Sequence, residues 1–214
     1  MSVADRLRSL RTRKPTSDDP FVADLQAAIG SDAVRFDGAH RALLSHDASV
    51  FDGGNSGPIC YPSTTEDVQA VVRLANEHGR NVVPRGAGTG LAGGAIPLGV
   101  PVVVALTKMN SVVEVDTVNR HAWVEPGVIN LDLTRQLTPL GFHFAPDPSS
   151  QQVCTLGGNV ANNSGGPHCL AYGVTNAHIL AMEVVLPSGE VAMLGGLDAE
   201  PEGYDLRGVF VGSE

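Results

Sequence analysis

The spacing of apolar residues predicts two helices in the first half of the chain. From Pro20 the apolar positions recur at helical spacing, with proline in the first turn and Gly30 where the helix would end. A second helix is predicted after a capping box formed by Ser63 and Glu66, with one apolar face that continues until Gly79. The section 31–57 between them is rich in turn-forming residues.

Short apolar runs at 59–62, 81–84 and 100–106 have the length of strands. The second helix separates the first two runs, and a glycine-rich stretch separates the last two. This order of strand, helix, strand, loop and strand is typical of βαβ units. It predicts a small parallel or mixed sheet between about 58 and 106.

Further along the chain, apolar and polar residues alternate with a period of two. The runs 111–116 and 121–127 alternate on either side of Asp116–Asn119, and 180–194 alternates around Pro187–Glu190. Both patterns predict antiparallel hairpins. The fold class expected is therefore α+β in two sub-lobes: a small βαβ-containing sheet, and a larger mixed or antiparallel sheet with helices.

Composition and charge restrict the class of protein. Hydrophobic residues make up 43% of 214 positions, and no apolar run approaches the roughly 20 residues that span a bilayer, so we expect a soluble protein without a transmembrane segment. A net charge of −9 argues against nucleic-acid partners. The basic cluster 6–14 is expected to be a solvated N-terminal arm. Three cysteines without zinc-ligand spacing suggest a reducing, cytoplasmic location and no metal site.

The glycine-rich stretch 84–94 is the first candidate binding segment, with five glycines in eleven residues. Residues Gly88–Gly93 match G-x-G-x-x-G, but Gly94 and Pro97 follow at once and prevent the helix that a Rossmann fingerprint requires. A Walker pattern is also absent. The segment instead predicts a loop whose backbone N–H groups form an anion-binding concavity, with a flexible surface loop as the alternative.

A second candidate segment, 155–166, has four glycines and three asparagines and follows the stretch 145–150 with its two serines. Asparagine and serine side chains can bond to a ribose or to the edge of a heteroaromatic ring. Two such segments suit a long ligand that carries phosphates and rings. Tight turns between short strands are the alternative.

Five stretches occur in the order PSTTEDVQAVVRLANEHGRNVVPRGAGTGLAGGA, APDPSS, TLGGNVANNSGGPHCLAYGVT, MEVVLPSGEV and VFVGSE. In this the chain closely resembles the FAD-binding (PCMH-type) domain of the vanillyl-alcohol oxidase/p-cresol methylhydroxylase flavoproteins. Within that family it looks most like glycolate oxidase flavoprotein subunits and D-lactate dehydrogenases. The resemblance covers about 42–214, leaves 1–41 as an N-terminal arm and helix, and implies a small lobe at about 58–106, a larger lobe at about 107–214 and FAD between them.

The resemblance also implies cofactor-binding positions. Around the FAD pyrophosphate it places Arg85, Gly86, Ala87, Gly88, Thr89, Gly90, Leu91 and Gly94. Beside the ribityl chain and the isoalloxazine it places Pro146, Asp147, Ser149, Ser150, Gly157, Gly158, Asn159, Asn162, Ser164 and Gly165. Further positions expected near the cofactor are Tyr172, Gly173, Val174 and the stretch 178–180, with Ile179 at the adenine.

Members of this family with covalent flavin carry a histidine at the position that Thr89 occupies here. A threonine hydroxyl is a poor partner for a stable flavin linkage, so the FAD is expected to be non-covalent. Cys154 and the pair His168–Cys169 lie near the second segment and remain the alternative attachment points.

The resemblance implies oxidation of a small 2-hydroxy acid, glycolate or D-lactate in type, by hydride transfer to flavin N5 while a protein base takes the hydroxyl proton. His143 and His168 are candidates for that base and Arg85 for a carboxylate contact, although each also has a structural interpretation. In relatives the catalytic and metal-binding histidines lie in a later cap domain, so no catalytic residue is assigned.

Relatives continue beyond Glu214 with a cofactor-contacting motif, which suggests a truncated chain that is inactive by itself. The family suggests an iron–sulfur subunit as the partner and electron acceptor. Binding to that subunit would place the protein at the surface of a membrane. Two alternatives remain open. One is a cap-less flavin-binding electron-transfer subunit without its own substrate site, and the other is a nucleotide-binding or scaffolding module that has lost flavin.

Overall fold

The computed structural model describes residues 19–197 and 203–214, so the predicted N-terminal arm at 6–14 lies outside the described residues. The chain divides into two compact units. Unit 1 comprises the chain up to Ala105 together with Pro187–Gly189. Unit 2 comprises Leu106–Leu186 and Glu190–Glu214. Each unit is described by itself.

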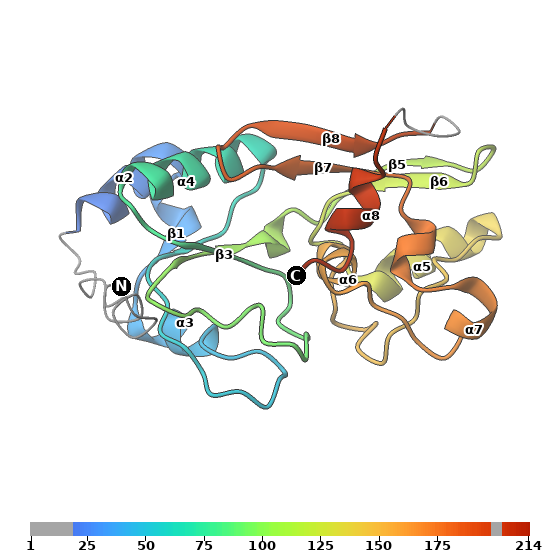
Figure 1. Cartoon of the computed structure of the whole chain (residues 1–214), viewed down its shortest axis with the longest axis horizontal. Coiled ribbons are helices and arrows are strands. Elements are labelled where there is room, and N and C mark those ends of the chain that lie inside the picture. Colours follow the sequence, from blue (N-terminus) through green and yellow to red (C-terminus); the bar gives the residue numbers. More distant parts are fainter. Residues whose placement is uncertain (1–18, 198–202) are drawn as a thin grey trace. The chain divides into compact units, whose positions relative to one another are not determined.

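Unit 1 has the predicted βαβ architecture (Figure 1). Its sheet has the strand order β1-β2-β4-β3; β4 pairs in parallel with both β2 and β3, and β1 pairs antiparallel to β2. The elements are α2 (Pro20–Ile29), η1 (Ser31–Ala33), β1 (Val34–Arg35), α3 (Gly38–Leu43), β2 (Ile59–Cys60), α4 (Thr65–Glu77), β3 (Val82–Arg85) and β4 (Val102–Ala105). The mixed sheet predicted from the apolar runs is therefore confirmed.

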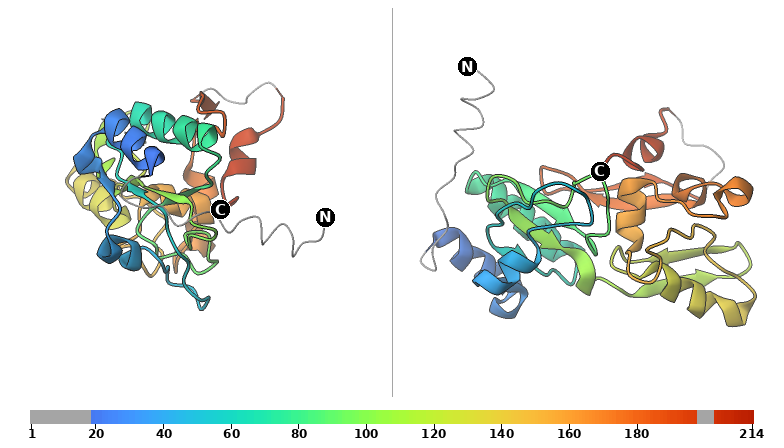
Figure 2. Two further views of the ribbon diagram at one scale, coloured as in Figure 1. Left: turned by 90° about the vertical axis from the view of Figure 1, so that its left-hand side faces the viewer. Right: turned by 90° about the horizontal axis from the view of Figure 1, so that it is seen from below.

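The core of unit 1 joins its sheet to its helices. All four residues of β4 are buried, as a strand with neighbours on both edges requires. Phe21 and Leu25 of α2 and Val71 of α4 are fully buried, and Figures 1 and 2 both show these helices side by side. The predicted apolar stripes of the two helices thus face a common interior.

The capping box of α4 lies one residue later than the sequence pattern suggested. Thr64, not Ser63, is the N-cap, and its hydroxyl accepts from Asp67 N at 3.2 Å. The Asp67 carboxylate accepts in return from the backbone N–H groups of Ser63 at 2.9 Å and of Thr64 at 3.3 Å. One short carboxylate therefore takes the role that was predicted for Glu66.

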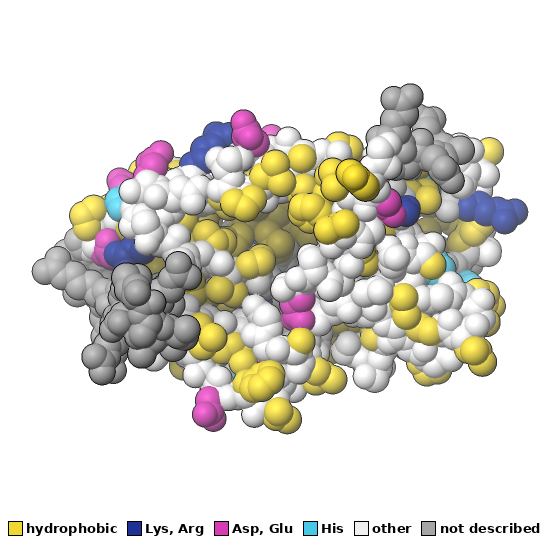
Figure 3. All heavy atoms as spheres, in the orientation of Figure 1, with side chains coloured by type: hydrophobic (Ala, Val, Ile, Leu, Met, Phe, Trp, Pro, Cys, Tyr) yellow, Lys and Arg dark blue, Asp and Glu magenta, His cyan; other side chains and the backbone are white. Residues whose placement is uncertain are grey.

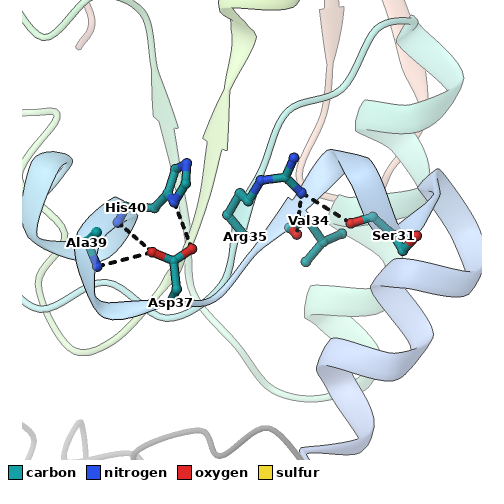
Figure 4. A network of polar contacts seen from close by, with 6 residues as sticks. All are labelled: Ser31, Val34, Arg35, Asp37, Ala39 and His40. Atoms are coloured by element: carbon teal, nitrogen blue, oxygen red, sulfur yellow. Dashed lines mark hydrogen bonds and ion pairs between the residues drawn. The ribbon is translucent and has the colours of Figure 1, made fainter.

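Three short elements in the turn-rich section 31–57, η1, β1 and α3, were not predicted. The strand β1 has only two residues, and α3 begins at an Asp37 cap that accepts from Ala39 N at 3.1 Å and from His40 N at 3.0 Å (Figure 4). The His40 ring also lies 2.7 Å from the Asp37 carboxylate, while Arg35 donates to Val34 O and Ser31 O (Figure 4). Elements this short have almost no periodic signal.

Unit 2 consists of two hairpins and short helices. Its elements are η2 (Leu106–Lys108), β5 (Val112–Asp116), β6 (His121–Val124), α5 (Asn130–Leu137), η3 (Thr138–Leu140), α6 (Leu156–Asn162), α7 (Cys169–Tyr172), η4 (Thr175–His178), β7 (Ala181–Val185), β8 (Val191–Gly195) and α8 (Leu206–Phe210). The antiparallel pairs β5–β6 and β7–β8 confirm both predicted hairpins. They form two separate two-stranded sheets where one larger sheet was expected.

The core of unit 2 forms around α5, an element that the sequence pattern did not reveal. Phe142 and Phe144 pack against this core. Its four buried residues come from three segments of the chain: Val128, Leu133, Leu137 and Leu156. Leu156 begins α6, so the second glycine-rich segment contains a helix where a loop was expected. Burial of Leu156 and the Thr155 cap offset the low helix propensity of two glycines and two asparagines. Within the described residues, no helix is long and apolar enough to cross a membrane.

Candidate functional site

The first glycine-rich segment lies between β3 and β4 of unit 1, where it forms an open loop. Gly88 and Gly93 have φ of 72° and 91°, which side-chain-bearing residues adopt at a cost. Among the described residues, no acceptor bonds to any backbone N–H of 87–94, a run of eight amide groups. These residues are partly or fully exposed, so their amides can bond to water and are also open to a ligand with acceptor oxygens.

Arg85 is buried beneath this loop, with only 6% of its surface exposed. Its Nη1 donates to Ala95 O at 3.2 Å and its Nη2 to His46 O at 2.7 Å. A Cβ at Gly88 would stand 2.1 Å from Arg85 Nη2, so only glycine lets the loop backbone pass this close to the guanidinium. Burial lowers the pKa of Arg85, partly offset by the charge of Asp47.

A segment that the sequence reasoning did not assign, 45–57, packs against the glycine loop. Gly57 N donates to Pro101 O at 2.7 Å, and a Cβ at Gly54 would lie 2.1 Å from Pro97 O. A Cβ at Gly93 would meet the Phe51 ring at 2.9 Å. The glycine density of 53–57 was the signal that could have revealed this close approach.

These two loops expose large apolar side chains. The exposed fractions are 98% for Val50, 58% for Phe51, 74% for Leu91 and 71% for Leu98. Figure 3 shows hydrophobic side chains gathered along the lower edge of the view, where both loops of unit 1 lie. The free amides of the loop therefore have an apolar border.

The second glycine-rich segment, in unit 2, uses its backbone amides internally. Gly157 N donates to Pro126 O at 2.8 Å, Gly158 N to the Thr155 hydroxyl at 3.3 Å, and Gly166 N to Cys169 Sγ at 2.9 Å. A Cβ at Gly157 would come within 2.7 Å of Pro126, so this glycine permits close packing. The segment can therefore offer a ligand its side chains more readily than its amides.

The predicted residues of unit 2 occupy several positions. Asn159 is 1% exposed with its Nδ2 unpaired among the described residues, and Asn162 donates to Gly158 O within the helix. Pro146, Asp147, Ser149 and Ser150 lie between η3 and α6; Gly157, Gly158, Asn159 and Asn162 on α6; Ser164 and Gly165 after α6; Tyr172 at the end of α7; Gly173 and Val174 before η4; and Ile179 after η4.

A pocket of about 330 Å³ in unit 2 brings some of these residues together. Its lining is partly aromatic and partly polar: Thr134, His143, Phe144, Ala145, Asp147, Gln151, His168 and Tyr172. His143 and Tyr172 contact edge to face with ring centroids 6.0 Å apart. Asp147 and Tyr172, both predicted near the cofactor, thus share a pocket with the two histidines that were considered as bases.

Asp147 and His168 form a close pair at this pocket. Asp147 Oδ2 lies 2.5 Å from His168 Nδ1, and Asp147 Oδ1 accepts from His168 N at 3.3 Å. Burial would raise the pKa of the Asp147 carboxyl, but the hydrogen bonds and charge of His168 together lower it. The carboxylate holds Nδ1 and leaves Nε2 of the exposed imidazole for other partners.

The cysteines considered as flavin attachment points differ in access. Cys154 is 3% exposed, and burial raises the pKa of its thiol. Cys169 is partly exposed and accepts the Gly166 N–H bond. Across 19–197 and 203–214, no group of three or more His, Cys, Asp or Glu residues could hold a metal ion.

A protein-family model described as an FAD binding domain matches residues 58–195. Glycolate oxidase subunit GlcD of Bacillus subtilis (strain 168) is 40% identical over 177 residues, which are 82% of this chain and 38% of that protein. GlcD of Escherichia coli (strain K12) is 42% identical over 156 residues, 73% of this chain and 31% of that protein. D-lactate dehydrogenase of Anaerostipes hadrus is 40% identical over 173 residues, 80% of this chain and 36% of that protein.

Solved structures share the fold. The 4-ethylphenol oxidase from Gulosibacter chungangensis is 29% identical with a TM-score of 0.75, and the match covers 90% of this chain and 39% of that one. An alkyldihydroxyacetonephosphate synthase has a TM-score of 0.82 at 24% identity, over 94% of this chain and 39% of that one. The chain thus spans between about 30% and 40% of the length of these relatives. With the matched model covering well over half of its residues, the chain belongs to the FAD binding domain family that its glycine-rich motifs predicted.

Proposed function

We propose that the loop 86–94 of unit 1 holds the diphosphate of a non-covalently bound FAD. The observation that carries this proposal is the run of unpaired backbone N–H groups at 87–94. A diphosphate offers only acceptor oxygens and negative charge, which is the complement of converging amide donors. The positive φ of Gly88 and Gly93 lets these amides turn toward one side without a side chain in the way.

The residues of unit 2 fit the uncharged part of the cofactor. Because the amides of 155–166 are largely paired, its contribution to a ribityl chain or a flavin edge comes from side chains. Asn159 Nδ2 and Asn130 Oδ1 are buried polar atoms that lack partners among the described residues, as sites for a polar ligand often are. The polar lining around Asp147 adds further donors and acceptors nearby.

For the complete protein we propose oxidation of a small 2-hydroxy acid. The relatives named glycolate oxidase subunit and D-lactate dehydrogenase support this substrate class. FAD, when bound, supplies the redox chemistry by accepting a hydride. This chain binds and orients the cofactor, and the group that takes the hydroxyl proton is expected in the part of the relatives that the chain does not span. The subunit names of two relatives support a partner protein as electron acceptor, for which an iron–sulfur subunit is the proposal.

The test begins with the purified protein and its absorbance. We expect bound flavin that acid precipitation releases into the supernatant, because Thr89 offers no stable linkage. Anaerobic addition of glycolate or D-lactate to the complete protein should then bleach the flavin absorbance. Colour that stays with the washed pellet would refute the non-covalent cofactor.

The remaining outcomes separate the alternative functions. Bound flavin that no 2-hydroxy acid reduces would instead support an electron-transfer subunit without a substrate site. A purified protein that takes up no FAD, even when the cofactor is added, would support a scaffolding module and refute the proposal for the loop.

A further inference from the structure

Arg85, the residue before the glycine loop, holds Ala95, the residue that follows it. Its Nη1 donates to Ala95 O at 3.2 Å. Burial raises the pKa of Asp47, and the nearby backbone N–H of Ala95 is one of the groups that lower it. The loop is therefore closed at its base by Arg85, with a carboxylate from the segment 45–57 close by.

Arg85 and Asp47 are linked to each other. Arg85 Nη2 donates to His46 O at 2.7 Å, one residue before Asp47. The Asp47 carboxylate accepts from Ser49 N at 2.9 Å, which fixes its orientation. Arg85 Nε and Asp47 Oδ2 are buried without hydrogen-bond partners among the described residues, so these two side chains interact through their charges.

Burial explains why the arginine needs this carboxylate. A guanidinium that is 6% exposed and bonded only to carbonyl oxygens would carry an uncompensated charge. Burial raises the pKa of Asp47, but its hydrogen bonds from Ser49, the nearby N–H of Ala95 and the charge of Arg85 together lower it, so the carboxylate is ionised at neutral pH. Asp47 is thus the charge partner of Arg85.

We propose that Arg85 and Asp47 are positioning residues that hold the loop 86–94 in the conformation whose free amides receive a diphosphate. This inference rests on the proposed function of the loop. A loop with five glycines has many accessible conformations, and a ligand that had to order it would lose binding free energy in doing so. Closing the loop at Ala95 removes most of those conformations before the ligand arrives.

The geometry distinguishes this role from direct contact. Arg85 is 6% exposed, the backbone of Gly88 passes over its Nη2, and each Nη donates to a carbonyl oxygen. Arg85 therefore acts from beneath the loop, through the position of its backbone. Asp47, which the sequence reasoning did not single out, supplies a negative charge near this guanidinium.

The test compares two cofactor forms in the complete protein. Flavin fluorescence gives the Kd of FAD and the Kd of riboflavin, which lacks the diphosphate, for the unaltered protein and for Asp47→Asn and Arg85→Lys. Each variant is expected to weaken FAD binding about tenfold or more, because Arg85→Lys loses hydrogen bonds of a charged group and Asp47→Asn leaves a buried guanidinium without its charge partner. Riboflavin affinity should stay within about twofold, because it does not use the amides of the loop.

The matched control is a partly buried arginine–aspartate ion pair of unit 1. Arg80 Nη2 lies 2.7 Å from Asp19 Oδ2, and their side chains are 15% and 12% exposed. Arg80→Lys should lower the melting temperature and leave both affinities unchanged, which separates positioning from general stability.

The outcomes separate the inference from the function on which it rests. If the unaltered protein prefers FAD to riboflavin and both variants keep that preference, the inference is refuted while the proposed function stands. Equal affinity of the unaltered protein for FAD and riboflavin would refute the proposed function, and the inference with it. If Arg85→Lys does not fold, Asp47→Asn decides by the same comparison, since Asn keeps one acceptor oxygen for the Ser49 N–H and removes the charge.

Discussion

Gly88 lies directly against the guanidinium of Arg85, with the position of a Cβ only 2.1 Å from Nη2. Its φ of 72° adds a second restriction. Gly88→Ala must therefore strain the backbone and also displace the group that closes the loop. We expect a loss of about 2 kcal/mol or more in the free energy of unfolding and weaker FAD binding, measured by denaturation and by fluorescence titration.

Gly79→Ala is the control for that experiment. Gly79 also has positive φ, at 62°, but a Cβ there would have nothing within 4 Å. Its substitution should cost about 1 kcal/mol of stability and leave FAD affinity unchanged. Equal losses of FAD affinity in the two variants would contradict the specific role of the Gly88–Arg85 contact.

The capping box of α4 gives a second prediction, because sequence and structure assign it differently. Asp67→Ala removes the acceptor of the Ser63 and Thr64 amides and should lower the free energy of unfolding by about 1 kcal/mol. Glu66→Ala removes only an exposed first-turn charge and should cost about 0.3 kcal/mol. Urea denaturation of both variants checks the order, and a larger loss for Glu66→Ala would restore the box read from the sequence.

The third prediction concerns pH and the Asp147–His168 pair. The folded pKa of Asp147 is lowered from its ordinary 3.8, so the carboxylate stabilises the folded state above about pH 4. As the pH falls from there through the folded pKa, that contribution is lost. Asp147→Asn should lower the melting temperature at pH 7 more than at pH 3.

Asp132→Asn, in an exposed ion pair with Arg135, is the control for the pH measurement. A surface pair of this kind contributes little, so its melting temperature should follow that of the unaltered protein at both pH values. If Asp147→Asn lowers the melting temperature by the same amount at pH 3 and pH 7, the Asp147–His168 pair contributes through packing alone.

Thiol labelling is the fourth prediction. Cys60 and Cys154 are buried, and burial raises the pKa of Cys60 to about 12 and raises that of Cys154 as well. Because the thiolate is the reactive form, iodoacetamide should modify Cys169 well before the other two in the native protein. Mass spectrometry of the tryptic peptides measures the order, and early labelling of Cys154 would reopen it as a flavin attachment point.

Part of the fold could be predicted because its signals lie within a few residues. The helix 65–77, the strands β2, β3 and β4, and both hairpins follow from apolar period, caps and turn residues. The helix α6 could not be predicted in this way. Leu156 packs in the core of unit 2 and the Thr155 hydroxyl caps the helix, and these contacts stabilise a helix in a sequence of glycine and asparagine.

For the candidate site, the sequence by itself determined that the loop after β3 is rich in glycine and poor in side chains, and that it belongs to the FAD binding domain family. Only the tertiary structure decided how that loop is held. Arg85 bonds to a carbonyl group 39 residues away, and Asp47 of the same distant segment supplies the opposite charge. Such contacts leave no local pattern, since they depend on which parts of the chain folding brings together.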